Sequence, residues 1–207
     1  MFKIENICKK ISGYIARELN LNDDRKSVIN YGIFAFIQIM ICIALVMIFG
    51  VIFNVMIEAL IVSFTTSMLR KSSGGAHASS PEKCAIIGTV VSVGMGITAK
   101  YAHFDLILII VVGSIIFAWS YYIIDKLAPV DSAAKPIRSH KMKKRLKKVS
   151  IITLSVYLAI VLILILSYLL TENLTLLTYS LCIYIGLSWQ IFSLTKTGHL
   201  ALRQFGH

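Results

Sequence analysis

A histidine and a cysteine stand seven positions apart in a short polar stretch, residues 70–84, that separates two apolar runs. His77 could accept the proton of the Cys84 thiol, which would then attack a carbonyl carbon, and could later pass that proton to a leaving amine. The chemistry that such a pair supports is acyl transfer. The alternative is a histidine and a cysteine that share a polar loop without reacting, and these two residues alone leave both interpretations open.

The pair can react only if the chain folds back between its members. In a continuous helix the two side chains would share a face but stand about 10.5 Å apart along the axis, beyond hydrogen-bonding reach. Gly74 and Gly75 favour a turn before His77, and Pro81 excludes a helix that runs through from the other side. Backbone N–H groups near Gly74 and Gly75, or at the start of the next helix, could bind the substrate as an oxyanion hole.

Ser80, Pro81 and Glu82 predict that start, with a serine N-cap, a proline at the first helical position and an acid in the first turn. Cys84 would then end the first turn, near the positive end of the helix dipole and next to Lys83. Both favour the thiolate, so the pattern indicates a reactive cysteine. We expect neither a metal nor a cofactor, because a lone histidine and cysteine lack the paired ligands that zinc sites use.

The apolar runs on either side must hold this stretch in place. The 207 residues are 57% hydrophobic and 15% charged, with a mean hydropathy of +0.79, which is too apolar for a soluble domain. Six apolar runs cover residues 28–53, 55–69, 85–99, 104–124, 149–170 and 174–194. The second and third are short compared with the roughly 20 residues that a full span needs. The sequence predicts an all-α, polytopic membrane helix bundle of about six transmembrane or partly inserted helices.

An amphipathic surface helix is predicted to precede the bundle, within residues 1–27. Its apolar residues recur at helical spacing between charged ones: Ile4, Ile7, Ile11, Ile15 and Leu19. Residues 28–207 would then form a single transmembrane domain. It contains the His/Cys loop at 70–84 and a basic loop at 125–148.

The formal charge of +11 lies at the ends of the apolar runs, so it predicts topology and no nucleic-acid partner. By the positive-inside rule, the basic loops place both termini and the His/Cys loop on the cytoplasmic side of the membrane. The lipid bilayer is itself a predicted partner of the chain. The run at residues 141–148 is foremost a lipid-headgroup contact. The alternative is that basic side chains form a dock, a binding site for an acidic peptide. Its residues would be Lys143 and Lys144 with Lys135 and Arg138.

Small and polar residues within the apolar runs predict where helices pack. Gly88, Ser92 and Gly96 would let another helix approach closely, within the chain or across a homodimer. Polar residues in a span usually face the bundle interior. The predicted topology places Gln190 in the half of the membrane near the His/Cys loop and Glu58 in the opposite half.

Three further cysteines are interpreted as small core residues without disulfides: Cys8, Cys42 and Cys182.

The order of these features resembles the accessory gene regulator B (AgrB) family over nearly the whole chain. The resemblance rests on the surface helix, the apolar hairpin, Gly74–Ala78 with Cys84, and later Ala128–Asp131 with Lys135–Ile137. The family comprises membrane cysteine endopeptidases of the bacterial cell membrane that process AgrD, a quorum-sensing propeptide.

The resemblance implies that Cys84 is the nucleophile and His77 its base. It also implies that the propeptide loses its C-terminal tail, and that a Cys or Ser side chain of the peptide then closes a thiolactone or lactone ring. Glu82, Ser79 and Asp131 are candidates to orient His77. The rival class is a small membrane transporter or channel, although the sequence lacks the matched pair of broken helices typical of transporters.

Overall fold

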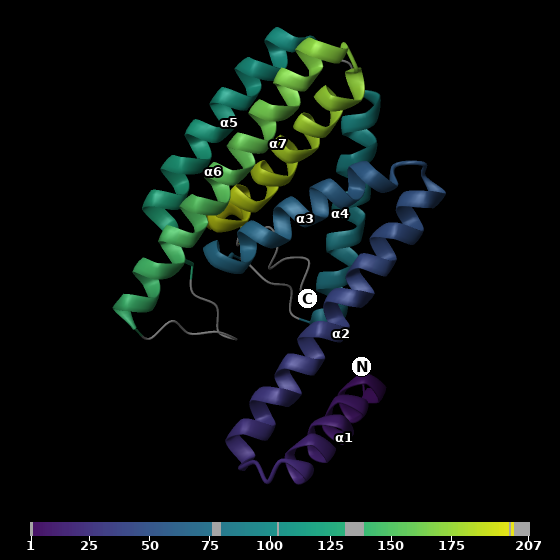
Figure 1. Ribbon diagram of the computed structural model, residues 1–207, viewed down its shortest axis with the longest axis vertical. Helices are drawn as coiled ribbons and strands as arrows, with labels where there is room; N and C mark the ends of the chain where they lie inside the picture. Colours follow the sequence, from purple (N-terminus) through teal and green to yellow (C-terminus); the bar gives the residue numbers. More distant parts are fainter. Residues whose placement is uncertain (1, 76–79, 103, 131–138, 199, 201–207) are drawn as a thin grey trace. The chain divides into compact units, whose positions relative to one another are not determined.

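Helices dominate the structure (Figure 1). The computed structural model describes residues 2–75, 80–102, 104–130, 139–198 and 200. Its seven long helices are α1 Phe2–Glu18, α2 Asp23–Ile52, α3 Met56–Ser73, α4 Pro81–Tyr101, α5 Leu106–Leu127, α6 His140–Thr171 and α7 Leu174–Leu194. Within those ranges, β-type pairing is limited to one isolated bridge between Gly74 and Val130. The all-α prediction is therefore confirmed.

The chain forms two compact units, Met1–Leu45 and Val46–His207. The first contains α1 and most of α2. Ser12 is buried on α1, and its hydroxyl lies 3.4 Å from the Oδ1 atom of Asn30 on α2. The apolar face that includes Ile7 remains exposed on this unit.

The six predicted apolar runs correspond in order to α2–α7. Helices α2, α4, α5, α6 and α7 are long and apolar enough to cross a membrane, which is consistent with a multi-pass membrane protein. Helix α3 has only 18 residues and carries Glu58, Arg70 and Lys71. Helix α4 is longer than the apolar run that predicted it, because its 21 residues continue through polar residues at both ends. At about 1.5 Å per residue it reaches the thickness of a bilayer core.

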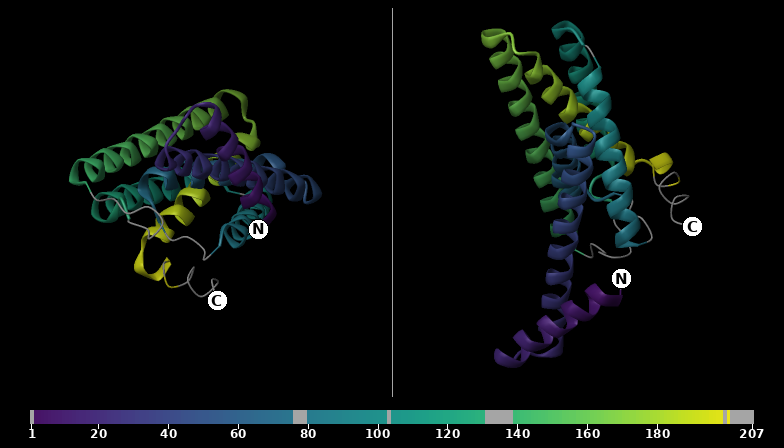
Figure 2. Two further views of the ribbon diagram at one scale, coloured as in Figure 1. Left: turned by 90° about the horizontal axis from the view of Figure 1, so that it is seen from below. Right: turned by 90° about the vertical axis from the view of Figure 1, so that its right-hand side faces the viewer.

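Helix α7 is the central helix of the second unit. It packs against α3, α4, α5 and α6, and Figure 2 shows it against both α5 and α6. Its side chains Tyr184 and Leu187 are almost fully buried. The contact with α3 is close because Gly186 has no side chain, and its carbonyl accepts a hydrogen bond from Thr66 Oγ1 at 3.2 Å. This contact brings the end of α7 to the end of α3.

Helices α3 and α4 pack against each other. Gly96, near the end of α4, lies against Ala59, near the start of α3, where an added Cβ would be 2.9 Å from the Ala59 nitrogen. Ser92 is buried, whereas a Cβ added at Gly88 would meet no atom within 4 Å. The small-residue stripe therefore packs within the chain at Gly96. A homodimer through its other end stays a prediction.

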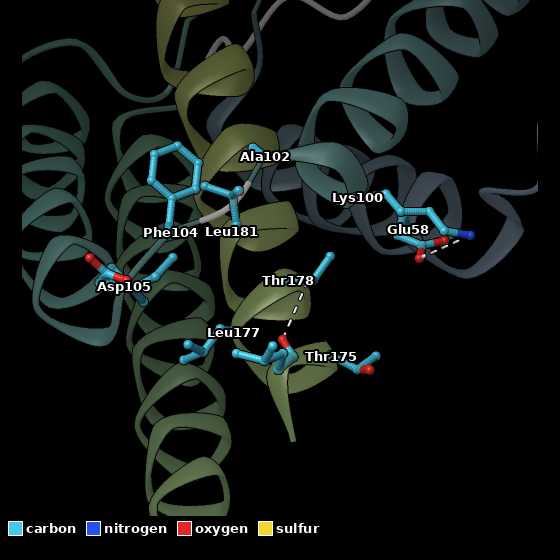
Figure 3. A pocket seen from close by; sticks show the side chains of 11 residues that line it. Glu58, Lys100, Ala102, Phe104, Asp105, Thr175, Leu177, Thr178 and Leu181 are labelled. Atoms are coloured by element: carbon cyan, nitrogen blue, oxygen red, sulfur yellow. Dashed lines mark hydrogen bonds and ion pairs between the residues drawn. The ribbon is translucent and has the colours of Figure 1, made fainter. Parts of the chain in front are cut away.

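A cavity of about 400 Å³ borders the end of the unit where α3 begins and α4 ends (Figure 3). Glu58 and Lys100 face each other on its wall, with 4.0 Å between carboxylate oxygen and Nζ, and Asp105 and Thr178 also line it. Lys100 is about 24 Å along α4 from Cys84 by helix rise. Glu58 thus lies at the end opposite Cys84, as predicted.

Candidate active site

Two glycines end α3 and turn the chain. Gly74 has φ +75° and ψ −152°, a conformation essentially restricted to glycine, and Gly75 has φ +132°. The Gly74 N–H donates to the Arg70 carbonyl oxygen at 3.0 Å and closes the last turn of α3. The turn predicted before His77 is confirmed. The Gly74 N–H is already used within it and is therefore not available to an oxyanion.

The start of α4 follows the predicted capping pattern. Ser80 is extended at φ −138° and ψ 152°, and its hydroxyl oxygen accepts a hydrogen bond from the Lys83 N–H at 3.2 Å. Its carbonyl oxygen accepts one from the Cys84 N–H at 3.0 Å, and Pro81 is the first helical residue. Cys84 is therefore fixed in the first turn of α4, where its thiol is free and partly buried.

Arg70 brings positive charge to this cysteine. It lies in the last turn of α3, and its guanidinium interacts electrostatically with Cys84. Its Nε atom is buried and has no hydrogen-bond partner within the part of the chain that the structure describes. Electropositive surroundings of this kind are typical of catalytic cysteines. In the sequence, the charge of Arg70 predicts only topology, because its spacing from Cys84 does not show that the two helix ends meet.

The histidine of the predicted pair lies outside the described residues. The same is true of Ser79 and Asp131, two candidates to orient it. Glu82, the third candidate, is exposed in the first turn of α4. The approach of His77 to Cys84 stays a prediction.

Two distant parts of the chain hold the glycine turn. The Val130 N–H donates to the Ser73 carbonyl oxygen at 2.9 Å, next to the bridge with Gly74. From α7, the Gln190 Nε2 donates to Ser73 Oγ at 3.0 Å and to the Gly74 carbonyl oxygen at 2.8 Å. The predicted location of Gln190 near the loop is confirmed. Its contacts, and the pairing of the proline-containing stretch with the turn, were not predicted.

Comparison with known proteins identifies the family. The family model for accessory gene regulator B matches residues 8–194. The chain belongs to the AgrB family. This membership confirms the resemblance and supports a role in the agr quorum-sensing system.

Two AgrB-like proteins of Clostridium perfringens are similar along nearly their whole length. The "Putative AgrB-like protein" of strain SM101 / Type A is 42% identical over 204 residues, which cover 97% of this chain and 95% of that protein. The "Putative AgrB-like protein 2" of strain 13 / Type A is 40% identical over 203 residues, with the same coverage of each chain. No solved structure matches the chain.

In this AgrB-family chain, the basic run forms the first turns of α6. Lys143 and Lys144 are exposed there, whereas Lys135 and Arg138 lie outside the described residues. The Lys147 Nζ pairs with the carboxylate of Asp125 at the end of α5, at 2.7 Å. Positive charges at a helix N-terminus oppose the helix dipole. The basic run at the start of α6 therefore does not stabilise that helix.

The other three cysteines differ from Cys84 in their surroundings. Cys8 and Cys182 are buried, which confirms their interpretation as core residues, and Cys42 is partly buried in α2. All four are free thiols. Among the described residues, no group of three or more His, Cys, Asp or Glu side chains is placed to hold a metal ion.

Proposed function

We propose that this AgrB-family chain is a membrane cysteine endopeptidase that cleaves an AgrD-type propeptide and promotes closure of a peptide ring. The observation that carries the proposal is the position of Cys84, a free thiol in the capped first turn of α4 beside the charge of Arg70. Reactive cysteines are typically found at helix N-termini and next to cationic side chains. Family membership supplies the substrate class.

The reaction proceeds by two acyl transfers. His77 takes the proton of the Cys84 thiol, and the sulfur attacks the carbonyl carbon of the scissile peptide bond. The C–N bond then breaks as His77 protonates the leaving amine, so the tail departs and the peptide remains as a thioester on Cys84. A Cys or Ser side chain of the bound peptide gives its proton to His77 and attacks the thioester carbonyl. The Cys84 sulfur leaves and recovers that proton, so ring closure consumes no water.

The tetrahedral intermediate carries negative charge on the oxygen of the attacked carbonyl, and this oxyanion requires hydrogen-bond donors next to Cys84. The Gly74 N–H is excluded because it is bonded to the carbonyl of Arg70. Arg70 itself offers an Nε–H donor that is buried and unbonded within the described ranges, on a side chain that interacts electrostatically with Cys84. We therefore assign Arg70 to stabilisation of the oxyanion that forms when the Cys84 sulfur attacks the carbonyl carbon.

Co-expression with the propeptide encoded in the same genome tests the function. Membranes that contain the chain should release the propeptide tail, and prior treatment with a thiol-alkylating reagent should stop the release. A transporter, the rival class, should not depend on one loop thiol. An intact propeptide in the presence of the untreated chain would contradict the proposal.

We propose that the Cys84 end of the second unit faces the cytoplasm. Positive side chains gather at this end, on the last turn of α3 and the first turns of α6. Lys100, at the opposite end, is paired with Glu58. The difference follows the positive-inside rule.

This orientation predicts opposite labelling of two exposed positions, Ser139 before α6 and Asn173 before α7. A membrane-impermeant maleimide added to intact cells should label Asn173→Cys and should leave Ser139→Cys unlabelled until the cells are opened. Ser73 is unsuitable for such a label, since it is fully buried. Outside labelling of Ser139→Cys would place the site on the wrong face and remove the basis for a cytoplasmic propeptide.

The exposed lysines at the start of α6 are predicted to bind acidic residues of the propeptide. Each exposed charge pair contributes about 0.2–1 kcal/mol, so the double variant Lys143→Gln/Lys144→Gln should raise KM by roughly 2- to 30-fold with little change in kcat. The difference in KM between the variant and the parent should be smaller at high salt, where screening already weakens propeptide binding to the parent. Cleavage measured against propeptide concentration at two salt concentrations checks this.

A change in the propeptide and a control in the chain distinguish a dock formed by Lys143 and Lys144 from a membrane anchor formed by the same lysines. Removing acids from the propeptide tail should raise KM for the parent but not for the double variant. The variant leaves Lys147 in place, so the ion pair between α6 and Asp125 of α5 is kept. Parent-like curves at both salt concentrations would rule the dock out.

A further inference from the structure

Gln190 is a buried amide directed at the glycine turn. It lies near the end of α7 with 0% exposure. Its Nε2 donates to Ser73 Oγ at 3.0 Å and to the Gly74 carbonyl oxygen at 2.8 Å, and Ser193 Oγ lies 3.3 Å from its Oε1. A carbonyl oxygen can only accept, so the amide nitrogen must be the atom that faces the turn. Both N–H groups and the oxygen of the side chain therefore have partners.

The turn is confined on two sides. An added Cβ at Gly75 would lie 2.7 Å from Ser193 Oγ and 3.4 Å from Gln190 Nε2, so α7 closes one side. On the other side, the Val130 N–H binds the Ser73 carbonyl oxygen at 2.9 Å. The turn is therefore held between α7 and Val130.

Loss of Gln190 would weaken the hydrogen bonding of the Gly74 carbonyl oxygen. Ser73 Oγ also donates to the Leu69 carbonyl oxygen at 2.9 Å, so this hydroxyl keeps a partner without the amide. The same hydroxyl lies 3.4 Å from the Gly74 carbonyl oxygen, but its single proton cannot serve both carbonyls well. A partly buried carbonyl that loses its shortest hydrogen bond is less stable, and the turn can move to find another donor.

We propose that Gln190 is a positioning residue, which fixes the turn from which His77 reaches Cys84. The inference rests on the proposed function of that pair. His77 follows Gly75 by two residues in the sequence, so the position of the turn sets where the loop begins. Cys84 is fixed separately by the Ser80 cap of α4. Gln190 therefore acts on the histidine side of the pair and should affect turnover more than propeptide binding.

The first test compares Gln190→Met, which keeps the length of the side chain but has no donor, with Ser180→Ala. Ser180 is a buried hydroxyl on the same helix that donates to Leu176. We expect Gln190→Met to lower kcat about 10- to 100-fold with KM within about 2-fold, because displacements near 1 Å in a catalytic group have effects of this size. Ser180→Ala should match the parent in both constants.

The second test needs no propeptide and follows alkylation of Cys84 by iodoacetamide, measured on the peptide that contains it. His77→Ala should slow alkylation, and Gln190→Met should slow it by a similar factor. The double variant should be no slower than His77→Ala alone, since Gln190 acts through the histidine. A merely structural role would give losses that multiply in the double variant.

The outcomes separate this inference from the proposed function. Parent-like kcat in Gln190→Met, or multiplying losses in the alkylation test, overturns the positioning role. If the parent cleaves no propeptide, the proposed function fails, and the alkylation test alone decides on Gln190. If Gln190→Met does not accumulate in membranes, Gln190→Asn is measured in the same way, because it keeps the amide but is one methylene too short to reach both acceptors.

Discussion

Cys84→Ala is expected to abolish propeptide cleavage, and Cys84→Ser should do the same. Alanine has no nucleophile, and a serine hydroxyl at this position is far harder to deprotonate than a thiol, even with a histidine and a cation nearby. Removal of a catalytic nucleophile lowers turnover by up to about 10⁶-fold, so tail release should fall below detection. Mass spectrometry of the propeptide after incubation with membranes that contain equal amounts of each variant measures this.

Two other cysteines provide matched controls. Cys8→Ala changes α1 in the first unit, and Cys182→Ala changes a buried position in α7. Cys182 interacts electrostatically with Glu58, which lies at the end of the second unit opposite the glycine turn. Both variants should cleave at rates close to that of the parent. Normal cleavage by Cys84→Ala would mean that the chain is not a cysteine endopeptidase.

The parts of the site that could be predicted are those with local causes. The end of α3 follows from two consecutive glycines, and the start of α4 follows from the Ser80 cap and Pro81. Each depends on backbone preferences and on hydrogen bonds within four residues. The first turn of α4, and hence the environment of Cys84, could therefore be placed from the sequence alone.

The parts that escaped prediction depend on contacts between distant residues. The hydrogen bond from Gln190 to Ser73 joins residues 117 positions apart, and no periodicity signals it. The same holds for Val130, which pairs with Ser73 through backbone atoms and so leaves no mark on residue type. The sequence position of Arg70 predicts only topology, since its proximity to Cys84 arises only when the two helix ends meet.

The length of α4 shows a second limit of sequence patterns. Its apolar run covers residues 85–99, but the helix extends from Pro81 to Tyr101. A hydropathy pattern detects only the apolar part of a helix. The backbone hydrogen bonds of α4 continue beyond that part, through the polar residues Glu82, Lys83 and Lys100. In α4 the short apolar run therefore reflects polar helix ends and not a short helix.

Gly74→Ala and Gly75→Ala should each lower cleavage by at least about 10²-fold. A Cβ on Gly74 would lie 2.2 Å from the Val130 carbonyl oxygen, and one on Gly75 would lie 2.7 Å from Ser193 Oγ. Both positions also have positive φ, which side chains rarely adopt. The turn must therefore shift, and with it the loop that begins there, and a misplacement near 1 Å can lower catalysis by about this factor.

Gly94→Ala is the control, because it adds the same methyl group to the helix that carries Cys84. A Cβ at this position meets no atom within 4 Å, and alanine in a helix interior is more favourable than glycine by about 1 kcal/mol. The variant should cleave like the parent and accumulate at least as well in membranes. Parent-like cleavage by Gly74→Ala would show that the turn can move without cost to the reaction. In that case neither Val130 nor Gln190, which hold the same turn, could position the catalytic pair through it.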